Sequence, residues 1–560
     1  MLSRQATGNR QGALTAVFLI AAAALHAVYV VHHRVNSDEP QHLHVAWAWV
    51  QGLLPYRDVF DNHSPLFSLL MAPVLRAIGE RPDIVFLARL AMLPLAALAL
   101  ALAWVIGRHL FSTRAALLAV ALCALVPDFM LGSVEYRTDV LWTVLWMAAM
   151  AILLTGHPTR SRAFLFGLAV GAALATSMKT SMLVLSLGVS GAAALYMLRA
   201  RGAKLPLPSL AAWSACALAG VLLVPALLVA VFASQGAWKP MIYGTLSHNL
   251  VPNLGLWREG AYRALILVAA LPLLWIVGRR IVEGADDPFL GAKRALLFLT
   301  AGVYYAALYG IWPLITRQDL LPFLPMAAVV VAPCFLALTG LARGWRPRLQ
   351  GLVRAASFAP AAVLVLEIAW TQRVEPVWQR NDTQHEVSLL KEVLRLTRRG
   401  DTVMDLKGET IFRERPFYFA LEAITEARIA DGSIRDDIPE RLIARGTPVA
   451  VADSPELPER GRNFLNANYI PLGELRVLGQ SLGRQDGSAT TSFEIGVPQR
   501  YVVTCENGGA TGLLDGTPYD GPRELARGRH TYLGSRSEGR ATLLWAGAVR
   551  RENLKIGSVK

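Results

Sequence analysis

Apolar runs of about 20 residues recur along the chain up to about residue 370, and polar connections separate them. Each run predicts a membrane-spanning helix, because about 20 apolar residues cross the hydrocarbon core and a helix pairs its own backbone groups there. The pattern therefore predicts a polytopic α-helical membrane protein with about eleven spans. The predicted spans begin near residues 13, 84, 115, 138, 163, 181, 210, 262, 295, 319 and 353.

From about residue 372 the pattern becomes that of a soluble domain. Helical spacing of apolar residues alternates there with short β-type runs, which is typical of a small α/β layer. After about residue 492 short runs separated by turn residues predict antiparallel strands. The segments are 388–399 and 438–445 for helices, and 401–405 and 448–452 for strands.

Two units follow from this change of composition. Residues 1–371 form the predicted transmembrane module, with a first external loop at about 32–83, and residues 372–560 form a soluble α/β or α+β domain. The soluble domain has neither a glycine-rich phosphate loop nor a spaced catalytic triad. A binding or structural role is therefore its default interpretation.

The charge of the connections predicts the orientation. Lys and Arg gather in alternate loops, which the positive-inside rule assigns to the cytoplasm. With a cytoplasmic N-terminus and an odd number of spans, the C-terminal domain is extracytoplasmic (periplasmic) in a multi-pass inner (plasma) membrane protein. The same rule accounts for much of the net charge of +14, so nucleic acid is not an expected partner. The basic pairs lie at Arg108 and Arg114, Arg160 and Arg162, and Arg199 and Arg201.

The first external loop carries the strongest candidate chemistry. Asp38 and Glu39 follow the first span directly, where neighbouring charges and partial burial can tune the proton affinity of a carboxylate. The segment 42–53 has the spacing of a helix lying in the interface, with Trp47 and Trp49 at headgroup depth. The alternative is that these acids and the histidines beside them are simply solvated.

The order of motifs in this loop resembles a known family. Asp-Glu after the first helix, Gly-x-x-Pro-Tyr-x-Asp at 52–58 and His-x-Pro-Leu at 63–66 are similar to the GT-C superfamily of membrane glycosyltransferases. Within this superfamily they resemble the dolichyl-phosphate-mannose-protein mannosyltransferase-like group (glycosyltransferase family 39). That group is related to lipid A aminoarabinose transferases. The resemblance is strong over 30–185 and looser to about 340.

The resemblance gives roles to charges in later external loops. Asp139 lies at the top of the fourth span, and the alternative for Arg137 is an ion pair with Glu135 or Asp139 that only caps the helix. Family members often have a lysine at the place of Lys179, which is thought to meet the phosphate of the lipid carrier; a snorkelling lysine is the alternative. Arg317 matches its family block only in part, because Gln-Asp follows it where Arg-Tyr is usual.

The implied activity is inverting transfer of a hexosyl or pentosyl group from a polyprenyl-phosphate-linked donor to a lipid, glycan or protein acceptor outside the membrane. Asp38 is the expected general base. Positive charge stabilises the phosphate leaving group, and a divalent metal is an alternative source of it. The expected catalytic residues are Asp38, Glu39 and Asp139; the substrate-binding ones Arg57, Asp58, His63, Arg137, Lys179 and Arg317; the metal ligands Glu39, His42 and His63.

Two other classes explain the helices equally well. A polyprenyl-lipid or sugar transporter or flippase would place ionisable groups near the bilayer midplane, whereas the acids here gather outside the spans. A scaffold without activity would bind envelope enzymes. The sequence favours the transferase and names neither its sugar nor its acceptor.

Overall fold

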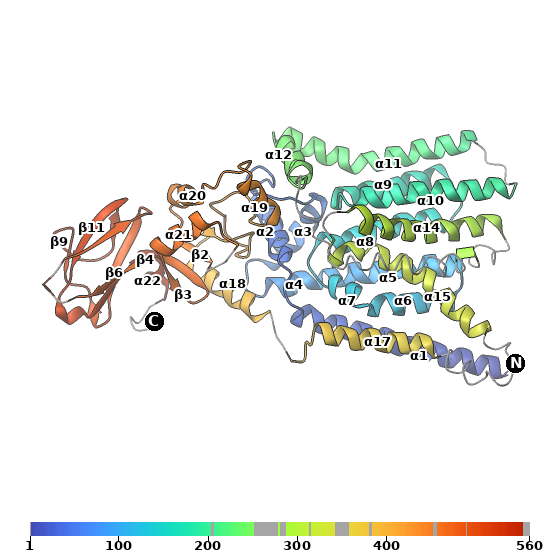
Figure 1. The fold of residues 1–560 in the computed structure, drawn as a ribbon, viewed down its shortest axis with the longest axis horizontal. Coiled ribbons are helices and arrows are strands. Elements are labelled where there is room, and N and C mark those ends of the chain that lie inside the picture. The colour runs from blue at the N-terminus through green and yellow to red at the C-terminus, as the bar shows by residue number, and fades with distance from the viewer. Residues whose placement is uncertain are drawn as a thin grey trace.

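A computed structural model describes residues 2–202, 207–250, 278–279, 287–312, 315–341, 358–379, 383–451, 456–485, 487–488 and 490–552. Long helices lie side by side in its first part, and a β-rich domain covers one end of them (Figure 1). We call this end of the helices the domain-facing end.

The bundle confirms the prediction of a polytopic membrane protein. Four described helical segments are long and apolar enough to cross a membrane, and five shorter apolar helices accompany them. All predicted spans overlap described helices except the one near residue 262, which lies outside the described residues. The bundle helices are α1 (Leu2–His32), α4 (Ile84–Leu90), α5 (Met92–Leu110), α6 (Thr113–Leu125), α7 (Pro127–Gly132), α8 (Thr138–Leu154), α9 (Arg160–Thr176), α10 (Thr180–Ala200), α11 (Leu207–Ser234), α14 (Pro288–Ile311), α15 (Phe323–Leu341) and α17 (Ala359–Val374).

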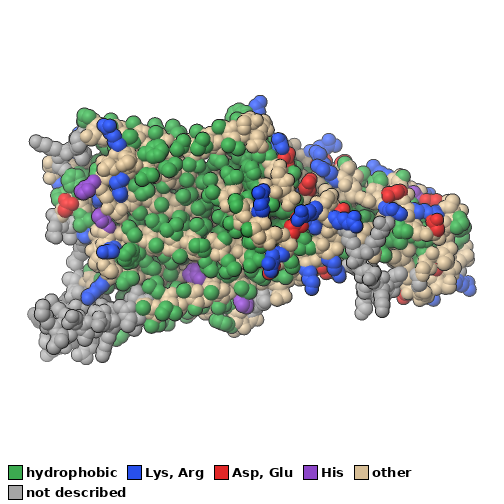
Figure 2. All heavy atoms as spheres, turned by 180° about the vertical axis from the view of Figure 1, so that it is seen from behind, with side chains coloured by type: hydrophobic (Ala, Val, Ile, Leu, Met, Phe, Trp, Pro, Cys, Tyr) green, Lys and Arg blue, Asp and Glu red, His purple; other side chains and the backbone are tan. Residues whose placement is uncertain are grey.

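The surface of the bundle has the distribution of side chains that a bilayer requires. A broad hydrophobic area covers its middle, and Lys and Arg gather toward its two ends (Figure 2). Large apolar side chains of the bundle helices are exposed, such as Leu185 of α10 at 61% and Leu222 of α11 at 56%. Lipid tails cover such side chains at no hydrophobic cost.

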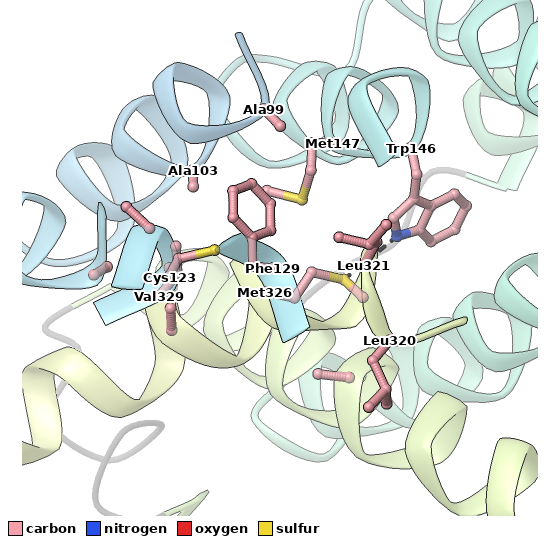
Figure 3. Packing of buried hydrophobic residues seen from close by; sticks show 14 of the residues in the cluster. Ala99, Ala103, Cys123, Phe129, Trp146, Met147, Leu320, Leu321, Met326 and Val329 are labelled. Carbon is pink, nitrogen blue, oxygen red and sulfur yellow. Dashed lines mark hydrogen bonds between the residues drawn. The ribbon is translucent and has the colours of Figure 1, made fainter. Parts of the chain in front are cut away.

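Small residues and dispersion contacts hold the bundle together. Gly167 and Gly171 let α9 approach α11 so closely that a Cβ at either position would meet a backbone carbonyl of α11. Deeper in the bundle, Trp146 Nε1 donates to Met326 Sδ at 3.4 Å, beside Phe129 (Figure 3). These contacts fix the helices whose ends carry the polar residues described below.

The segment around Lys179 contains two helices. Helix α9 ends at Thr176 and α10 begins at Thr180, so Lys179 lies in the turn between them. This excludes a single kinked helix, which would have inverted the orientation of every later span.

Helix α2 (Asp38–Gln51) differs from its prediction. It begins at Asp38 rather than near residue 42, and Gly52 ends it with a φ of +79°. Trp47, predicted to lie at headgroup depth, is only 4% exposed and stacks on His44 at 5.4 Å. The reason is tertiary: a loop of the C-terminal domain covers this face of α2, since His44 Nδ1 donates to Ile411 O at 2.8 Å.

The C-terminal domain contains two sheets with helices beside the first. The first has the order β1-β2-β4-β12-β6-β10, with β3 on β4 and β7 on β6, and the second has the order β5-β11-β8-β9. Strands β1 and β2 are parallel, so the predicted α/β layer is confirmed, and the predicted antiparallel strands follow it. The elements are α18 (Gln384–Leu396), β1 (Val403–Met404), α19 (Ala423–Ala430), α20 (Ile438–Arg445), β2 (Val449–Val451), α21 (Glu459–Asn468), β3 (Tyr469–Leu472), β4 (Leu475–Arg484), β5 (Thr491–Ile495), β6 (Gln499–Cys505), β7 (Gly508–Gly509), β8 (Leu513–Leu514), β9 (Thr517–Pro518), β10 (Arg523–Leu525), β11 (Gly528–Leu533), β12 (Arg540–Trp545) and α22 (Ala546–Glu552).

An apolar cluster joins this domain to the bundle. Leu43 and Trp47 of α2 pack in the same buried cluster as Leu390 of α18 and Ile411 and Phe412 of the domain. The cluster holds the loop at 405–411 over the N-terminal half of α2. Helices α3 (Leu66–Ile78) and α12 (Trp238–Ile242) and the π-helix η1 (Tyr243–Ser247) lie at the same end.

Candidate active site

Polar side chains from segments far apart in the sequence meet at the domain-facing end of the bundle (Figure 1). The contributing segments are the start of α2, the links from α7 to α8 and from α9 to α10, the 3₁₀-helix η2 (Arg317–Leu320), and the loop at 405–411.

Asp38 lies between two cations. Its Oδ2 accepts from Arg137 Nη1, and its Oδ1 accepts from Lys407 Nζ at 2.8 Å. Burial by itself raises the pKa of Asp38, but the guanidinium of Arg137 and the ammonium of Lys407 outweigh it and hold the pKa well below its usual range. The group is therefore a carboxylate, and each of its oxygens is bound to one cation.

Arg137 is the centre of the acidic group. It is extended at the N-cap of α8, and its Nε donates to Asp139 Oδ2 at 3.0 Å and lies 3.7 Å from Glu135 Oε2. Asn36 Oδ1 accepts from Arg137 Nη1 at 2.7 Å. The two pairs considered from the sequence both form, and Asp38 is added to them. Arg137 thus does more than cap a helix, because it connects α8 to the start of α2.

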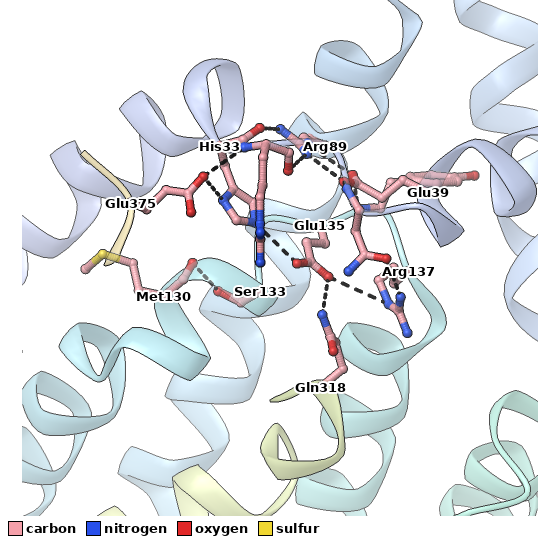
Figure 4. Close-up of polar contacts among 12 residues, drawn as sticks. His33, Glu39, Arg89, Met130, Ser133, Glu135, Arg137, Gln318 and Glu375 are labelled. Atoms are coloured by element: carbon pink, nitrogen blue, oxygen red, sulfur yellow. Dashed lines mark hydrogen bonds and ion pairs between the residues drawn. The ribbon is translucent and has the colours of Figure 1, made fainter. Parts of the chain in front are cut away.

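Glu39 points away from these cations into a fully buried ion pair with Arg89. Glu39 Oε1 and Oε2 lie 2.6 and 2.8 Å from the guanidinium, and both side chains are 0% exposed (Figure 4). Backbone N–H groups of Tyr136 and Asn36 also donate to Glu39, at 2.8 and 2.9 Å. Burial raises the pKa of Glu39, but Arg89 outweighs it, so the pKa is lowered. All of these contacts bind the start of α2 to its neighbours.

Arg89 is not among the site residues predicted from the sequence. Its guanidinium also donates to three carbonyls at the end of α1, those of Val30, His33 and Arg34, at 3.1, 2.8 and 3.0 Å. The signal that could have found it is an arginine within a long apolar run, which needs a partner there.

A second polar group lies behind Arg137. His33 lies 3.3 Å from both Glu135 Oε1 and Glu375 Oε1, and Gln318 Nε2 donates to Glu135 Oε2 at 2.8 Å (Figure 4). These contacts fix Glu135, and through it the side of Arg137 that faces away from Asp38.

Lys179 meets an acid of the same chain. Its Nζ donates to Asp319 Oδ1, and Asp319 Oδ2 accepts from Thr316 N at 2.8 Å. Asp319 belongs to the part of the block that departs from the family pattern. Arg317, two positions before Asp319 in η2, has no ion-pair partner among the described residues and is partly exposed. Lys179 is also within electrostatic range of Asp139, so it belongs to the same charged group.

Arg57 and Asp58 do not join this group. They pair with each other at 2.8 Å on the surface, and Asp58 Oδ2 accepts from Leu54 N at 2.8 Å, which closes the turn. The Arg57 side chain is 49% exposed. These contacts place both residues in a turn beside α11 and α12 rather than at Asp38.

His42 and His63 lie against each other, with ring centroids 4.3 Å apart. Burial lowers the pKa of His42 far below its usual value, and its Nε2 is buried without a hydrogen-bond partner among the described residues. Burial also lowers the pKa of His63, but a hydrogen bond with Asp61 at 3.1 Å outweighs it, so that pKa is raised.

The three residues considered as metal ligands do not form one set. Glu39 is bound to Arg89, whereas the two histidines lie side by side. Within the described ranges, no group of three or more His, Cys, Asp or Glu side chains is placed to hold a metal ion. Among the described residues, Glu39, His42 and His63 therefore do not form a joint metal site in this arrangement.

Lys407 was also missed, and it comes from the C-terminal domain. It lies three positions after the end of β1, and the loop at the carboxyl end of a parallel strand is a usual place for a binding residue. Further contacts hold the domain at the site: Asn62 Nδ2 donates to Glu422 Oε1 at 2.6 Å, and Tyr418 donates to the carbonyl of Tyr56. The domain, for which the sequence predicted a binding or structural role, thus supplies a charged side chain to this group.

Comparisons with known proteins agree with this architecture. Residues 62–238 match the family model described as dolichyl-phosphate-mannose-protein mannosyltransferase. No curated protein sequence matches the chain significantly. The structure of ArnT from Cupriavidus metallidurans in the apo state is similar, with a TM-score of 0.56 and 15% identity over 84% of this chain and 98% of that one.

Two further structures resemble the chain. ArnT from the same organism bound to undecaprenyl phosphate has a TM-score of 0.56 and 14% identity, over 83% of this chain and 97% of that one. The Archaeoglobus fulgidus oligosaccharyltransferase in the apo form has a TM-score of 0.45 and 11% identity, over 78% and 69%. Residues 62–238 thus match a mannosyltransferase family model, and the chain shares the fold of ArnT.

Proposed function

We propose that the protein transfers a hexosyl or pentosyl group from a polyprenyl-phosphate-linked donor to a hydroxyl of a lipid, glycan or protein acceptor, with inversion at the anomeric carbon. The observation that carries the proposal is the carboxylate of Asp38 between the cations of Arg137 and Lys407. Such an arrangement brings together a carboxylate that can serve as the base and two cations that can bind a phosphate once the substrates exchange these contacts. Undecaprenyl phosphate in the similar ArnT structure supports the choice of carrier.

In the proposed reaction, the acceptor oxygen attacks the anomeric carbon as its proton passes to Asp38. The bond from that carbon to the phosphate oxygen breaks, and the electron pair leaves with the polyprenyl phosphate. Positive side chains stabilise this leaving group, so no second acid is needed to protonate it. Asp139 supports Asp38 by orienting Arg137 through the contact at 3.0 Å. Glu39 positions the start of α2 rather than reacting itself.

The proposed side of the membrane is the extracytoplasmic one. Basic pairs such as Arg160 and Arg162 at the start of α9 lie at the end of the bundle opposite to the site, which the positive-inside rule assigns to the cytoplasm. The N-terminus is then cytoplasmic and the C-terminal domain periplasmic.

A reconstituted transfer assay tests the function. Purified full-length protein is incubated with a panel of radiolabelled undecaprenyl-phosphate sugars and with membrane extracts of a deletion strain as acceptor. We expect one donor to be consumed, undecaprenyl phosphate to be released, and one glycosyl residue missing from the strain to be restored. Movement of the donor between leaflets without consumption would instead support a transporter. The anomeric configuration of the product, measured by NMR, tests inversion.

Lys179→Met is expected to raise the KM for the donor roughly tenfold and to change kcat less, because a charge-assisted contact to a phosphate is lost. Steady-state kinetics at several donor concentrations measures the changes in KM and kcat separately. Lys239→Met removes an exposed lysine of α12 and is the matched control. An unchanged KM in Lys179→Met would show that Lys179 only pairs with Asp319.

A further inference from the structure

The loop that carries Lys407 is built around one buried acid. Asp405 accepts hydrogen bonds from the backbone N–H groups of Gly408 and Thr410, at 3.0 and 2.9 Å, and from Arg415 Nε at 2.6 Å. Glu409 accepts from the N–H of Lys407 at 2.9 Å. These contacts close a tight turn that carries Lys407.

The turn rests directly on α2. Gly408 has a φ of +106°, and a Cβ on it would lie 2.8 Å from His44 Cβ, so only glycine permits this approach. His44 itself donates to Ile411 O at 2.8 Å. The backbone of the turn is therefore fixed against α2, and Lys407 reaches Asp38, which lies six positions before His44 on this helix.

Asp38 cannot act as a base in this arrangement. Each of its oxygens is bound to one cation, and a carboxylate bound in this way has little affinity for a proton. The cations are equally unavailable to a phosphate while both are bound to Asp38. Arg137 is held by Asp139 and Glu135 as well, whereas Asp38 is the one acid paired with Lys407 among the described residues. Of the two cations, Lys407 is the one free to change partners.

A cavity of about 360 Å³ lies beside the turn. It is lined by Met404, Leu406 and Glu409 of the loop, by Leu389 and Leu390 of α18, and by Ser37 and Pro40 at the start of α2. The backbone of the turn stays in place against α2, whereas the flexible stem of Lys407 lets its ammonium change partner by rotation of the side chain alone.

We infer that Lys407 is a ligand of the donor phosphate, and that the C-terminal domain activates the site when this lysine moves from Asp38 to the phosphate. This inference rests on the proposed function and adds a binding residue to it. The ammonium of Lys407 then binds the phosphate, and Asp38 is paired only with Arg137. The affinity of Asp38 for the acceptor proton therefore rises when the donor is present. The arrangement couples donor binding to the activity of the base.

Binding of undecaprenyl phosphate to the full-length protein tests this without knowledge of the sugar. Native mass spectrometry in detergent gives dissociation constants, with undecaprenol as the uncharged probe of the chain alone. Lys407→Gln is expected to weaken undecaprenyl phosphate binding roughly tenfold and to leave undecaprenol binding unchanged. Lys407→Arg is expected to keep most of the affinity. The control Lys391→Gln, an exposed lysine of α18, is expected to match the wild type.

A double-mutant cycle tests whether Lys407 exchanges Asp38 for the phosphate or only lies near both. Asp38→Asn alone is expected to tighten undecaprenyl phosphate binding several-fold, because Lys407 no longer has a competing partner. In the Lys407→Gln background the same change is expected to have a clearly smaller effect. If Asp38→Asn tightens undecaprenyl phosphate binding by the same factor in both backgrounds, or if Lys407→Gln leaves binding unchanged, the inference is overturned and the proposed function stays intact. A wild type that binds both lipids equally would contradict the proposed donor and the inference together.

Discussion

Asp38→Asn is expected to lower the kcat of glycosyl transfer by roughly 10²- to 10⁴-fold, the usual contribution of a positioned general base. An amide has the shape of the carboxylate but takes no proton at neutral pH, so the acceptor hydroxyl remains protonated as it attacks. Arg137 keeps its contacts with Asp139 and Glu135, at 3.0 and 3.7 Å, so the cation is not displaced. The measurement is single-turnover transfer at saturating donor.

The matched control is Asp83→Asn. Asp83 is likewise an acid at the start of a helix, α4, but its side chain is 37% exposed and pairs with Arg81 on the surface. We expect this variant to retain activity. Undecaprenyl phosphate binding and thermal unfolding of both variants separate lost chemistry from lost structure. A folded Asp38→Asn protein with normal kcat would remove Asp38 from the mechanism.

The sequence predicted those parts of the site that depend on the order of spans and loops. Apolar runs locate the helices, and the charges of the loops locate the end of the bundle to which Asp38, Arg137, Asp139 and Lys179 belong. Topology alone predicts that these residues lie on the same side of the membrane, because alternate loops share a side, and the packing of the helices then brings them into contact. The structure places all four of them in one charged group.

The remaining parts depend on tertiary contacts that no local pattern contains. Lys407 is 369 positions from Asp38, and only the docking of the domain brings it there. Arg57 was predicted from its motif, but the motif builds a turn in which Arg57 pairs with Asp58. Glu39 adjoins Asp38 in the sequence, yet neighbouring positions on a helix point in different directions, and Glu39 reaches Arg89 instead.

Arg89→Met is expected to destabilise the protein by about 3–5 kcal/mol, since it leaves the Glu39 carboxylate buried without its partner. It also removes the donors for the carbonyls of Val30, His33 and Arg34 at the end of α1. Reversible unfolding of the detergent-solubilised protein in SDS, with the midpoint of thermal unfolding as a second measure, gives the effect. The control Arg81→Met removes an arginine that is 49% exposed in its pair with Asp83, and no measurable change is expected.

The double variant Glu39→Gln/Arg89→Met decides what the pair contributes. If the cost of Arg89→Met comes from the unpaired charge, neutralising Glu39 as well is expected to recover a large part of it, because a neutral amide is easier to bury than a carboxylate. If the cost comes from the α1 carbonyls, the double variant is as unstable as Arg89→Met. In both cases we expect transfer to fall in Arg89→Met, since the ion pair fixes the start of α2. Asp38 directly precedes Glu39 on α2, so its distance from Arg137 and Lys407 depends on the ion pair of Glu39 with Arg89.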